Sequence, residues 1–216
     1  MRCLQLASPS LPIGAYAYSQ GLEMAVELGW VSDAESLAAW LRDQMEQGLR
    51  AVDIPLFARL YDAVANGDEH QFEALSAALV AQRETRELRA DDCDRGLALA
   101  RLLRDLGIEH LPLPAGRGVP LAASFACAAW HWQVPRDSAA QAYGWAWLEG
   151  QVLAGVKLIP LGQVAGQRLL CALLEPLCAA VTVGLELDDD DIGGSLPALA
   201  MASALHETQY TRLFRS

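Results

Sequence analysis

Ser19 is the residue whose surroundings most resemble those of an enzyme nucleophile. It stands at the centre of Ala17-Tyr18-Ser19-Gln20-Gly21, which misses the G-x-S-x-G motif of serine hydrolases by its first glycine. That motif places the serine on a tight turn after a strand, and the sequence predicts neither feature here. An ordinary helix N-terminus is therefore the favoured interpretation, and a serine hydrolase that uses Ser19 is kept as an alternative.

Two short patterns begin like metal sites and then depart from them. His206-Glu207 opens like the H-E-x-x-H zinc motif, but Tyr210 occupies the position of the second histidine. The acidic run 188–191 opens like an EF-hand loop, but Leu199 stands in place of the bidentate glutamate. The phosphate-binding motif G-x-x-x-x-G-K-[ST] does not occur in the sequence. We therefore expect no tightly bound metal or cofactor and no nucleotide hydrolysis by the chain itself.

The densest cluster of charges is RETRELRADDCDR, at residues 83–95. Opposite charges stand four residues apart in Arg83 with Glu87 and in Asp91 with Arg95, the spacing of neighbours on a helix surface. One interpretation is a solvated, ion-paired helix face. The other is a surface that presents an arginine to an anion of another protein.

Lys157 stands alone in the apolar stretch VLAGVKLIPLGQ, close to the helix end that Pro160 imposes. Its charge suits the negative end of the helix dipole, and its long stem can cover apolar surface while the ammonium stays in water. The sharper hypothesis is a buried lysine at an interface.

The final stretch, HETQYTRLFRS, combines aromatic and basic side chains. Helical spacing places Tyr210, Leu213 and Phe214 on one face, bordered by Arg212 and Arg215. So short a terminal helix is marginal in water, so it is expected to dock on its own domain, on a sister subunit or on a partner.

Near the N-terminus, two prolines and a glycine keep residues 8–15 out of regular structure. From Tyr18 the spacing is helical, and Tyr18 and Leu22 fall on the face expected to pack. The opposite face is expected to be free for a partner and carries Tyr16, Gln20 and Glu23.

The rest of the chain shows helical periodicity and no strand-like segment of useful length. In the first half, helices are expected at 33–49 after a capping box of Ser32 and Glu35, and at 53–67 after the cap Asp53. Asp68 is expected to begin one or two helices over 69–106, and a linker follows at 110–120. In the second half, helices are expected at 121–132, after Pro135 with Ser138 as the cap, at 161–185 and from Ala198. The helix after Pro135 is apolar on nearly every side. The prediction is an all-α fold: one domain, 1–216, a helical bundle of about eight to ten helices with a central apolar helix.

Composition narrows the classes of partner. The net charge is −11, with 16 basic against 27 acidic residues, which opposes binding to nucleic-acid phosphates. Hydrophobic residues make up 53% of the chain and charged residues 20%, so apolar surfaces are expected to be covered by protein partners. The N-terminus has no signal-peptide pattern and the longest uncharged apolar run, 121–134, is too short to span a bilayer, so we expect a cytoplasmic protein with no membrane contact.

Several blocks of sequence together resemble the urease accessory protein F family. They are SPSLPIGAYAYSQGLEMAVELGWV, VDIPLFARLY with RETRELR, and VKLIPLGQVAGQRLL with SALHETQYTRLFRS. The resemblance extends over nearly the whole chain in order. It is weaker at Ala15 and Ala17, where the family more often has Gly and Ser, and in the segments 109–119 and 184–194.

The resemblance implies a non-enzymatic, all-helical chaperone that forms a homodimer. Such a protein would bridge accessory protein D, also called H, and the GTPase accessory protein G, in GTP-dependent nickel insertion into apo-urease. Nickel would pass through the complex without a tight site on this chain. A helical GTPase-regulating scaffold unrelated to urease is the alternative.

Within this hypothesis, two groups of residues are expected to contact partners. Docking of accessory protein D/H is assigned to Tyr210, Arg212, Leu213, Phe214 and Arg215. Binding of the GTPase, or coupling to it, is assigned to Tyr16, Gln20, Glu23, Glu84, Arg86, Glu87 and Lys157.

Overall fold

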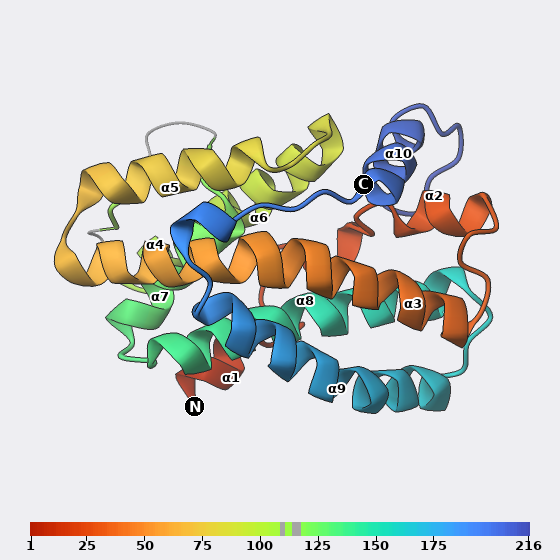
Figure 1. The fold of residues 1–216 in the computed structure, drawn as a ribbon, viewed down its shortest axis with the longest axis horizontal. Helices are drawn as coiled ribbons and strands as arrows, with labels where there is room; N and C mark the ends of the chain where they lie inside the picture. The colour runs from red at the N-terminus through yellow and green to blue at the C-terminus, as the bar shows by residue number, and fades with distance from the viewer. Residues whose placement is uncertain (109–110, 114–117) are drawn as a thin grey trace.

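The longest helical run of the molecule starts after Asp33 and ends at Gly67. In the computed structural model, which describes residues 1–108, 111–113 and 118–216, this run consists of α3 (Ala34–Gln44), the π-helix η2 (Met45–Asp53) and α4 (Ile54–Asn66). Figure 1 shows it crossing the molecule without a break. The Asp33 side chain accepts a hydrogen bond from Ser36 N at its start, and Gly67 ends it with φ of 67°.

The predicted helix break before Asp53 is wrong. Asp53 has helical dihedral angles, φ −68° and ψ −47°, and its side chain caps nothing. Pro55 cannot donate to the helical hydrogen-bond ladder, and the chain accommodates this missing donor with the wider π-helical turns just before it.

Asp68 begins the next helix, as predicted: its carboxylate accepts a hydrogen bond from Gln71 N, and α5 (Glu69–Ala81) follows. The helical stretch over 69–106 consists of two helices. Thr85 caps α6 (Arg86–Asp105) by accepting from Leu88 N, and residues 82–85 turn the chain between them.

The second half of the bundle is built from α7 (Leu121–His131), α8 (Arg136–Leu158) and α9 (Gln163–Leu185). The predictions for these three helices are confirmed, except that Pro135 rather than Ser138 precedes the first residue of α8. α7 packs against α4 and α6, and α8 packs against α9, α4 and α1. The close approach of α9 to η2 depends on glycine, because a Cβ atom at Gly184 would lie 2.9 Å from the main-chain oxygen of Arg50.

An aromatic cluster lies where α4, α7 and α8 meet. The rings of Phe57 and Tyr143 stack with centroids 5.4 Å apart, and Phe125 meets both rings edge-on. The surrounding buried core is continuous and runs from Leu6 to Phe214. The all-α fold class is confirmed for the part of the chain that the structure describes.

The N-terminal residues differ most from the prediction. α1 (Arg2–Leu6) and the short 3₁₀ turn η1 (Ala15–Ala17) precede α2 (Leu22–Glu27), so no helix begins at Tyr18. Tyr18 is extended, and Gln20 and Gly21 take positive φ values of 54° and 80°. These angles turn the chain. Tyr18 and Leu22 are buried and Tyr16 is exposed, as predicted, but Gln20 and Glu23 of the face expected to be free are turned inward.

Two remaining elements lie near the C-terminus. The 3₁₀ turn η3 (Asp189–Asp191) precedes α10 (Pro197–His206), which packs against α2 and α6. Part of the predicted 110–120 linker, residues 110 and 114–117, lies outside the described residues.

By length and composition α9 could cross a membrane, a test that a core helix of a soluble protein also passes.

Candidate functional site

The segment 207–216 is not helical and lies against the residues that precede α2. Arg215 N donates to Ala17 O at 2.8 Å, and Ser19 N and Gln20 N both donate to the main-chain oxygen of Ser216, at 2.6 and 3.0 Å. The Ser19 hydroxyl donates to the same oxygen at 2.6 Å. Backbone contacts beside the turn formed by Gln20 and Gly21 therefore hold the last residues of the chain.

Glu23 is the carboxylate that fixes this segment. It is buried, with 7% of its surface exposed. Its two oxygens accept backbone hydrogen bonds from Leu213 N at 2.7 Å and Phe214 N at 2.8 Å. Consecutive N–H groups that converge on a carboxylate form a charge-assisted contact that is stronger than a neutral one. The expectation that Glu23 lies on a free face is wrong, because it is occupied by the chain's own C-terminal segment.

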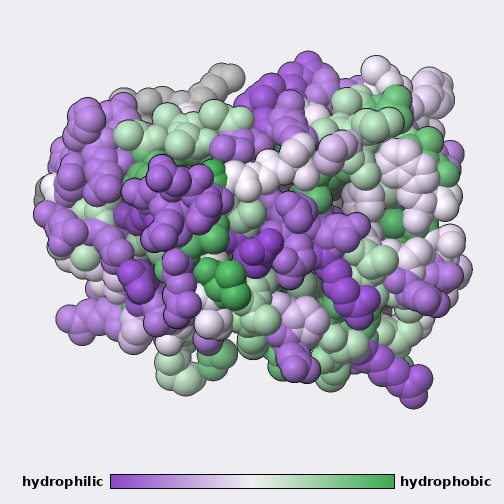
Figure 2. All heavy atoms as spheres, viewed as in Figure 1, coloured by the Kyte–Doolittle hydropathy of each residue, from purple (hydrophilic) through white to green (hydrophobic). Residues whose placement is uncertain are grey.

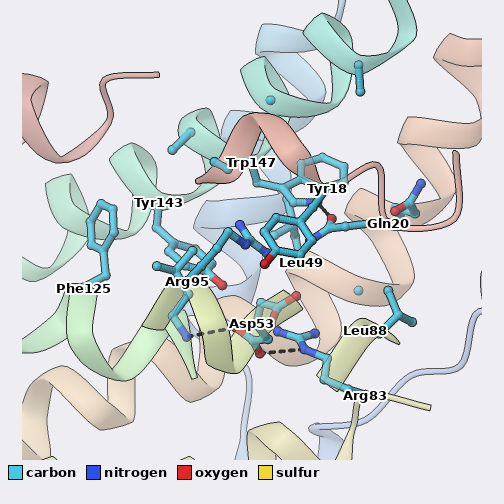
Figure 3. Close-up of a pocket in the computed structure, with 18 of the residues that line it drawn as sticks. Tyr18, Gln20, Leu49, Asp53, Arg83, Leu88, Arg95, Phe125, Tyr143 and Trp147 are labelled. Carbon is cyan, nitrogen blue, oxygen red and sulfur yellow. Dashed lines mark hydrogen bonds and ion pairs between the residues drawn. The ribbon is translucent and has the colours of Figure 1, made fainter. Parts of the chain in front are cut away.

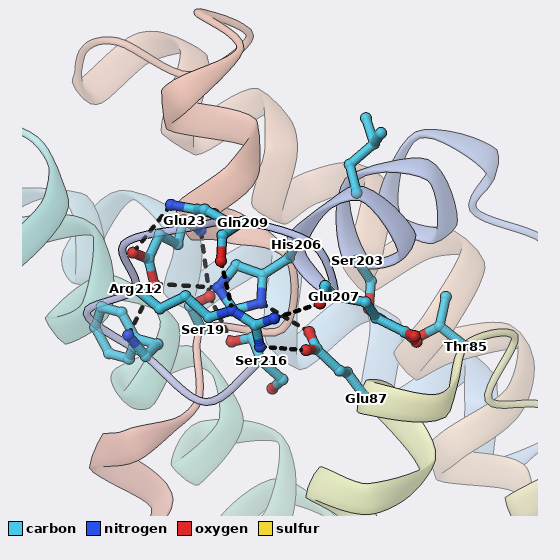
Figure 4. A network of polar contacts seen from close by, with 12 residues as sticks. Ser19, Glu23, Thr85, Glu87, Ser203, His206, Glu207, Gln209, Arg212 and Ser216 are labelled. Carbon is cyan, nitrogen blue, oxygen red and sulfur yellow. Dashed lines mark hydrogen bonds and ion pairs between the residues drawn. The ribbon is translucent and has the colours of Figure 1, made fainter.

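His206, fully buried at the end of α10, lies between two carboxylates (Figure 4). Its Nδ1 is 2.7 Å from Glu87 Oε2 and its Nε2 is 3.2 Å from Glu23 Oε2. A ring nitrogen that carries a proton donates to the carboxylate it faces. Arg212 adds a guanidinium, with Nη1 2.8 Å from Glu87 Oε1. We call Glu23, Glu87, His206 and Arg212 the tail network.

The side chains of the segment divide into two groups, contrary to the prediction of one helical face. Phe214 is buried and lies under Lys157, whose Nζ is 5.6 Å from the ring centroid. Tyr210 is fully exposed and Leu213 is 65% exposed. Arg215 is held at Tyr18: burial raises the pKa of the Tyr18 phenol, and a hydrogen bond with the Arg215 side chain opposes this shift.

Beside the segment lies a cavity of about 230 Å³. Its wall includes the π-helix η2, the N-terminal loop, α8 and the turn before α6, and four of the residues assigned to the GTPase line it: Tyr16, Gln20, Glu84 and Lys157. Tyr16, Glu84 and Lys157 are exposed, whereas Gln20 is turned inward, where its Nε2 donates to Asp91 Oδ2 at 2.7 Å and its Oε1 accepts from Trp147.

Charged residues line this cavity, and the ion pair between Arg83 and Asp53 connects elements that are distant in sequence (Figure 3). Arg83 binds Asp53 of η2 at 2.5 Å and Asp92 of α6 at 2.8 Å, and Arg95 binds Asp91 at 2.5 Å. Burial disfavours the charged guanidinium, but Asp53 and Asp92 raise the pKa of Arg83 well above its ordinary value.

These contacts correct the predictions for residues 83–95. The predicted Asp91–Arg95 pair is present, but Arg83 does not pair with Glu87, since it precedes the helix and reaches across to η2. The interpretation as a solvated face is wrong for these pairs, which are largely buried. Arg86 is exposed, and it pairs with Glu207 at 3.0 Å.

The geometry does not support a nucleophilic Ser19. Its hydroxyl is fully buried, donates to Ser216 O and accepts from Glu23 N at 3.2 Å. Within the described residues, no group of three His, Cys, Asp or Glu side chains is arranged to hold a metal ion. The arrangement can position a segment of chain.

Comparison with known proteins gives the family. The family model described as UreF matches residues 31–174. A urease accessory protein UreF from Alkalilimnicola ehrlichii is 51% identical over 216 residues, which cover 100% of this chain and 95% of the relative. Proteins of the same name from Pseudomonas putida and Klebsiella pneumoniae are 50% and 47% identical, with 100% of this chain and 97% of each relative covered.

This chain belongs to the UreF family. The alignments with these UreF relatives include every residue of this chain, so the residues of the tail network and of the cavity all lie within the aligned region. The resemblance drawn from the sequence blocks is confirmed, and the chain is a urease accessory protein.

The sequence alone did not show His206 as part of a site, because its partners Glu23 and Glu87 are 183 and 119 residues away. One signal was available in α6. Glu87, Asp91 and Asp94 stand at i, i+4 and i+7, and this acidic stripe contacts His206, Gln20 and Tyr18, respectively.

Proposed function

We propose that this UreF-family chain is a urease maturation chaperone that bridges accessory protein D/H and the GTPase accessory protein G, and so supports GTP-dependent nickel insertion into apo-urease. The relatives' name supports a role as a urease accessory protein. The observation that carries the bridging role is the C-terminal segment, which is held by its backbone and leaves Tyr210 and Leu213 exposed.

The exposed side chains of this segment suit the docking of accessory protein D/H. A segment that is already ordered pays less conformational entropy on binding than a free tail does. Tyrosine in a central position is typical of residues that dominate interface energies. Phe214 is buried, and the exposed Arg212 and Arg215 contact Glu87 and Tyr18 of the domain, so these three residues support the shape of the segment. Tyr210 and Leu213 make the direct contact.

The test is the double substitution Tyr210→Ala, Leu213→Ala. Because both side chains are exposed, the thermal midpoint is expected to stay within about 2 °C of wild type, while co-purification with accessory protein D/H is lost. Leu106→Ala, at a half-exposed leucine on another helix end, is the matched control and should keep the complex. Normal co-purification by the double variant would refute this assignment.

The GTPase is proposed to bind beside the cavity, where Tyr16, Glu84 and Lys157 are exposed, with Arg86 close to the tail network. Gln20, Glu23 and Glu87 then act as coupling residues, because they are turned inward.

Charge-reversing substitutions can distinguish a specific contact of the GTPase with this face from a general effect of the protein's net charge. Lys157→Glu with Arg86→Glu is expected to reduce recruitment of the GTPase, since both side chains are exposed. Arg42→Glu, on an exposed position of α3, changes the net charge by half as much without altering this face and should not affect recruitment. Unchanged recruitment and unchanged urease activation by the first variant would contradict the proposal.

The whole function is tested by co-expression of urease and its accessory proteins in the cytoplasm, with and without this chain. Omission of the chain is expected to leave urease with little nickel and little activity; unaffected urease would favour the alternative of a GTPase-regulating scaffold unrelated to urease. We propose that the chain works as a homodimer and that nickel passes through the complex. A tight nickel site found by equilibrium dialysis on the isolated chain would count against passage.

A further inference from the structure

Aromatic residues line the cavity of about 230 Å³ that lies beside the C-terminal segment. They come from the N-terminal loop, α7, α8 and the C-terminal segment, and they are Tyr16, Tyr18, Phe125, Tyr143, Trp147 and Phe214. On the outer face that η2 and α4 present, by contrast, Figure 2 shows hydrophobic residues interspersed among hydrophilic ones. A concave wall rich in aromatic residues is typical of a site that binds a small apolar group.

The volume of the cavity limits the size of its ligand. An apolar cavity of about 150 Å³ in another protein is large enough to bind benzene. Pockets for drug-sized molecules have volumes of about 300 to 1,000 Å³. This cavity lies between the two, so its volume suits one aromatic ring or two fused rings.

The charges in the interior of the cavity wall are already paired. Arg83 binds Asp53 and Asp92, and two nitrogens of Arg95 bind the two carboxylate oxygens of Asp91. The remaining charged residues of the wall are exposed to solvent. An ionic ligand would lose its hydration in the interior without gaining a free partner of opposite charge, so the cavity favours an uncharged ligand.

Tyr143 contributes a polar group to this interior. Only 7% of its surface is exposed, and its hydroxyl makes no hydrogen bond with the residues that the structure describes. Figure 3 shows its side chain directed toward the charged residues of the cavity. Burial raises the pKa of the phenol well above its ordinary value, and Asp53 and Asp92 raise it further, so the hydroxyl keeps its proton. A buried hydroxyl without a partner is unfavourable, and a ligand atom that hydrogen-bonds to it would remove this cost.

We propose that this cavity binds an uncharged aromatic group of one or two rings, with one hydrogen-bonding atom that faces the Tyr143 hydroxyl. The group is either a free small molecule or an aromatic side chain that the GTPase inserts, since the exposed Tyr16 and Lys157 assigned to the GTPase also line the cavity. The binding site itself is independent of the proposed function, and only the second source rests on it.

Indole and indene are suitable probes, because they have nearly the same shape and differ in the ring N–H. Ligand-observed NMR titration of the purified full-length chain is expected to show binding of both. Indole should bind about fivefold more tightly, which is the effect of about one net hydrogen bond. Tyr143→Phe should remove this preference by weakening the binding of indole while leaving that of indene unchanged.

Gly150 of α8 offers a variant that fills the cavity. It lines the cavity, and a Cβ atom there would meet nothing within 4 Å, so Gly150→Leu adds volume without a backbone clash. This variant is expected to lose the binding of both probes and to keep the wild-type thermal midpoint. Gly162→Leu, at a glycine that also has open space around it but lies outside the cavity wall, is the matched control and should bind both probes normally.

Three outcomes would overturn the inference. They are the absence of binding of either probe to wild type at millimolar concentrations, binding that Gly150→Leu leaves unchanged, and equal affinities of the wild type for indole and indene.

Recruitment of the GTPase by Gly150→Leu then distinguishes the two sources of the aromatic group. Loss of recruitment would support an inserted side chain, and normal recruitment would support a free small molecule. The variant with Lys157→Glu and Arg86→Glu tests the GTPase face separately, so failure of the cavity site and failure of the proposed function give different results.

Discussion

Replacing Glu23 with alanine is expected to release the C-terminal segment while the helical bundle stays folded. The Glu23 carboxylate accepts the backbone N–H groups of Leu213 and Phe214 at 2.7 and 2.8 Å, and it contacts His206 at 3.2 Å. A hydrogen bond to a charged group contributes about 1.5 to 3 kcal/mol. Leu213 is largely exposed and can turn its N–H to water, so the lower end of that range applies and the two bonds sum to about 3 kcal/mol.

A local loss of about 3 kcal/mol corresponds to a more than 100-fold change in the opening equilibrium of the segment. Hydrogen exchange followed by mass spectrometry measures this change directly in peptides that cover 207–216. The expected result for Glu23→Ala is exchange that is faster by about two orders of magnitude in this segment, with the protection of α4 and α8 unchanged.

Glu27→Ala is the matched control, because Glu27 lies on the same helix, is exposed and has the same chemistry. It should leave exchange in 207–216 at the wild-type rate. Glu23→Gln retains one acceptor oxygen but turns an NH₂ group toward other donors, so it is expected to behave much more like alanine than like glutamate. An increase of less than about threefold in Glu23→Ala would show that Glu23 does not hold the segment.

Two further predictions concern packing and thiol chemistry. A methyl group on Gly96 would overlap Val119 O and come within 2.7 Å of the next residue, so Gly96→Ala should lower the free energy of unfolding in urea by about 2 to 3 kcal/mol. Gly150→Ala, with open space around it, should raise it by about 0.5 to 1 kcal/mol. Burial raises the pKa of the Cys127 thiol to about 12, so iodoacetamide at pH 8 should label exposed Cys178 and leave Cys127 unmodified until the chain unfolds; equal rates would contradict the buried core.

The helix boundaries that the sequence predicted correctly are those set by neighbours in the chain. Gly67 ends a helix because it adopts a left-handed conformation, and Asp68 begins the next because its carboxylate reaches Gln71 N three residues away. Each of these depends on a few adjacent dihedral angles.

Two features that the sequence missed, at Asp53 and Tyr18, depend on distant partners. Asp53 has the residue type of an N-cap, but Arg83 binds its carboxylate from 30 residues away, and the helix continues through it. Tyr18 has helical spacing to Leu22, but its phenol lies beside Asp94 at 3.4 Å, and its backbone is extended. Local preference is weak compared with such tertiary contacts.

The same reasoning explains why the tail network was only half predicted. The sequence indicated that residues 210–215 must dock, because a short apolar and basic terminal segment is not stable alone. It placed them on a helical face, because spacing is the only geometry that a sequence provides. Their conformation is instead set by Glu23. Amphipathic spacing predicts that this carboxylate faces solvent, but the backbone N–H groups of the C-terminal segment bind it and bury it.

Helix α6 connects the two proposed docking surfaces through one acidic stripe. At its first turn, Glu87 holds His206 and Arg212 of the tail network. One turn further, Asp91 holds Gln20, whose amide lines the cavity next to Lys157 and Tyr16. Because these contacts are paired, a partner that moves the C-terminal segment takes Arg212 away from Glu87, which lies on the same rigid helix that positions Gln20. The coupling between a D/H-bound tail and the GTPase face is therefore expected to act through α6, and Glu87→Gln should weaken it without altering either exposed contact surface.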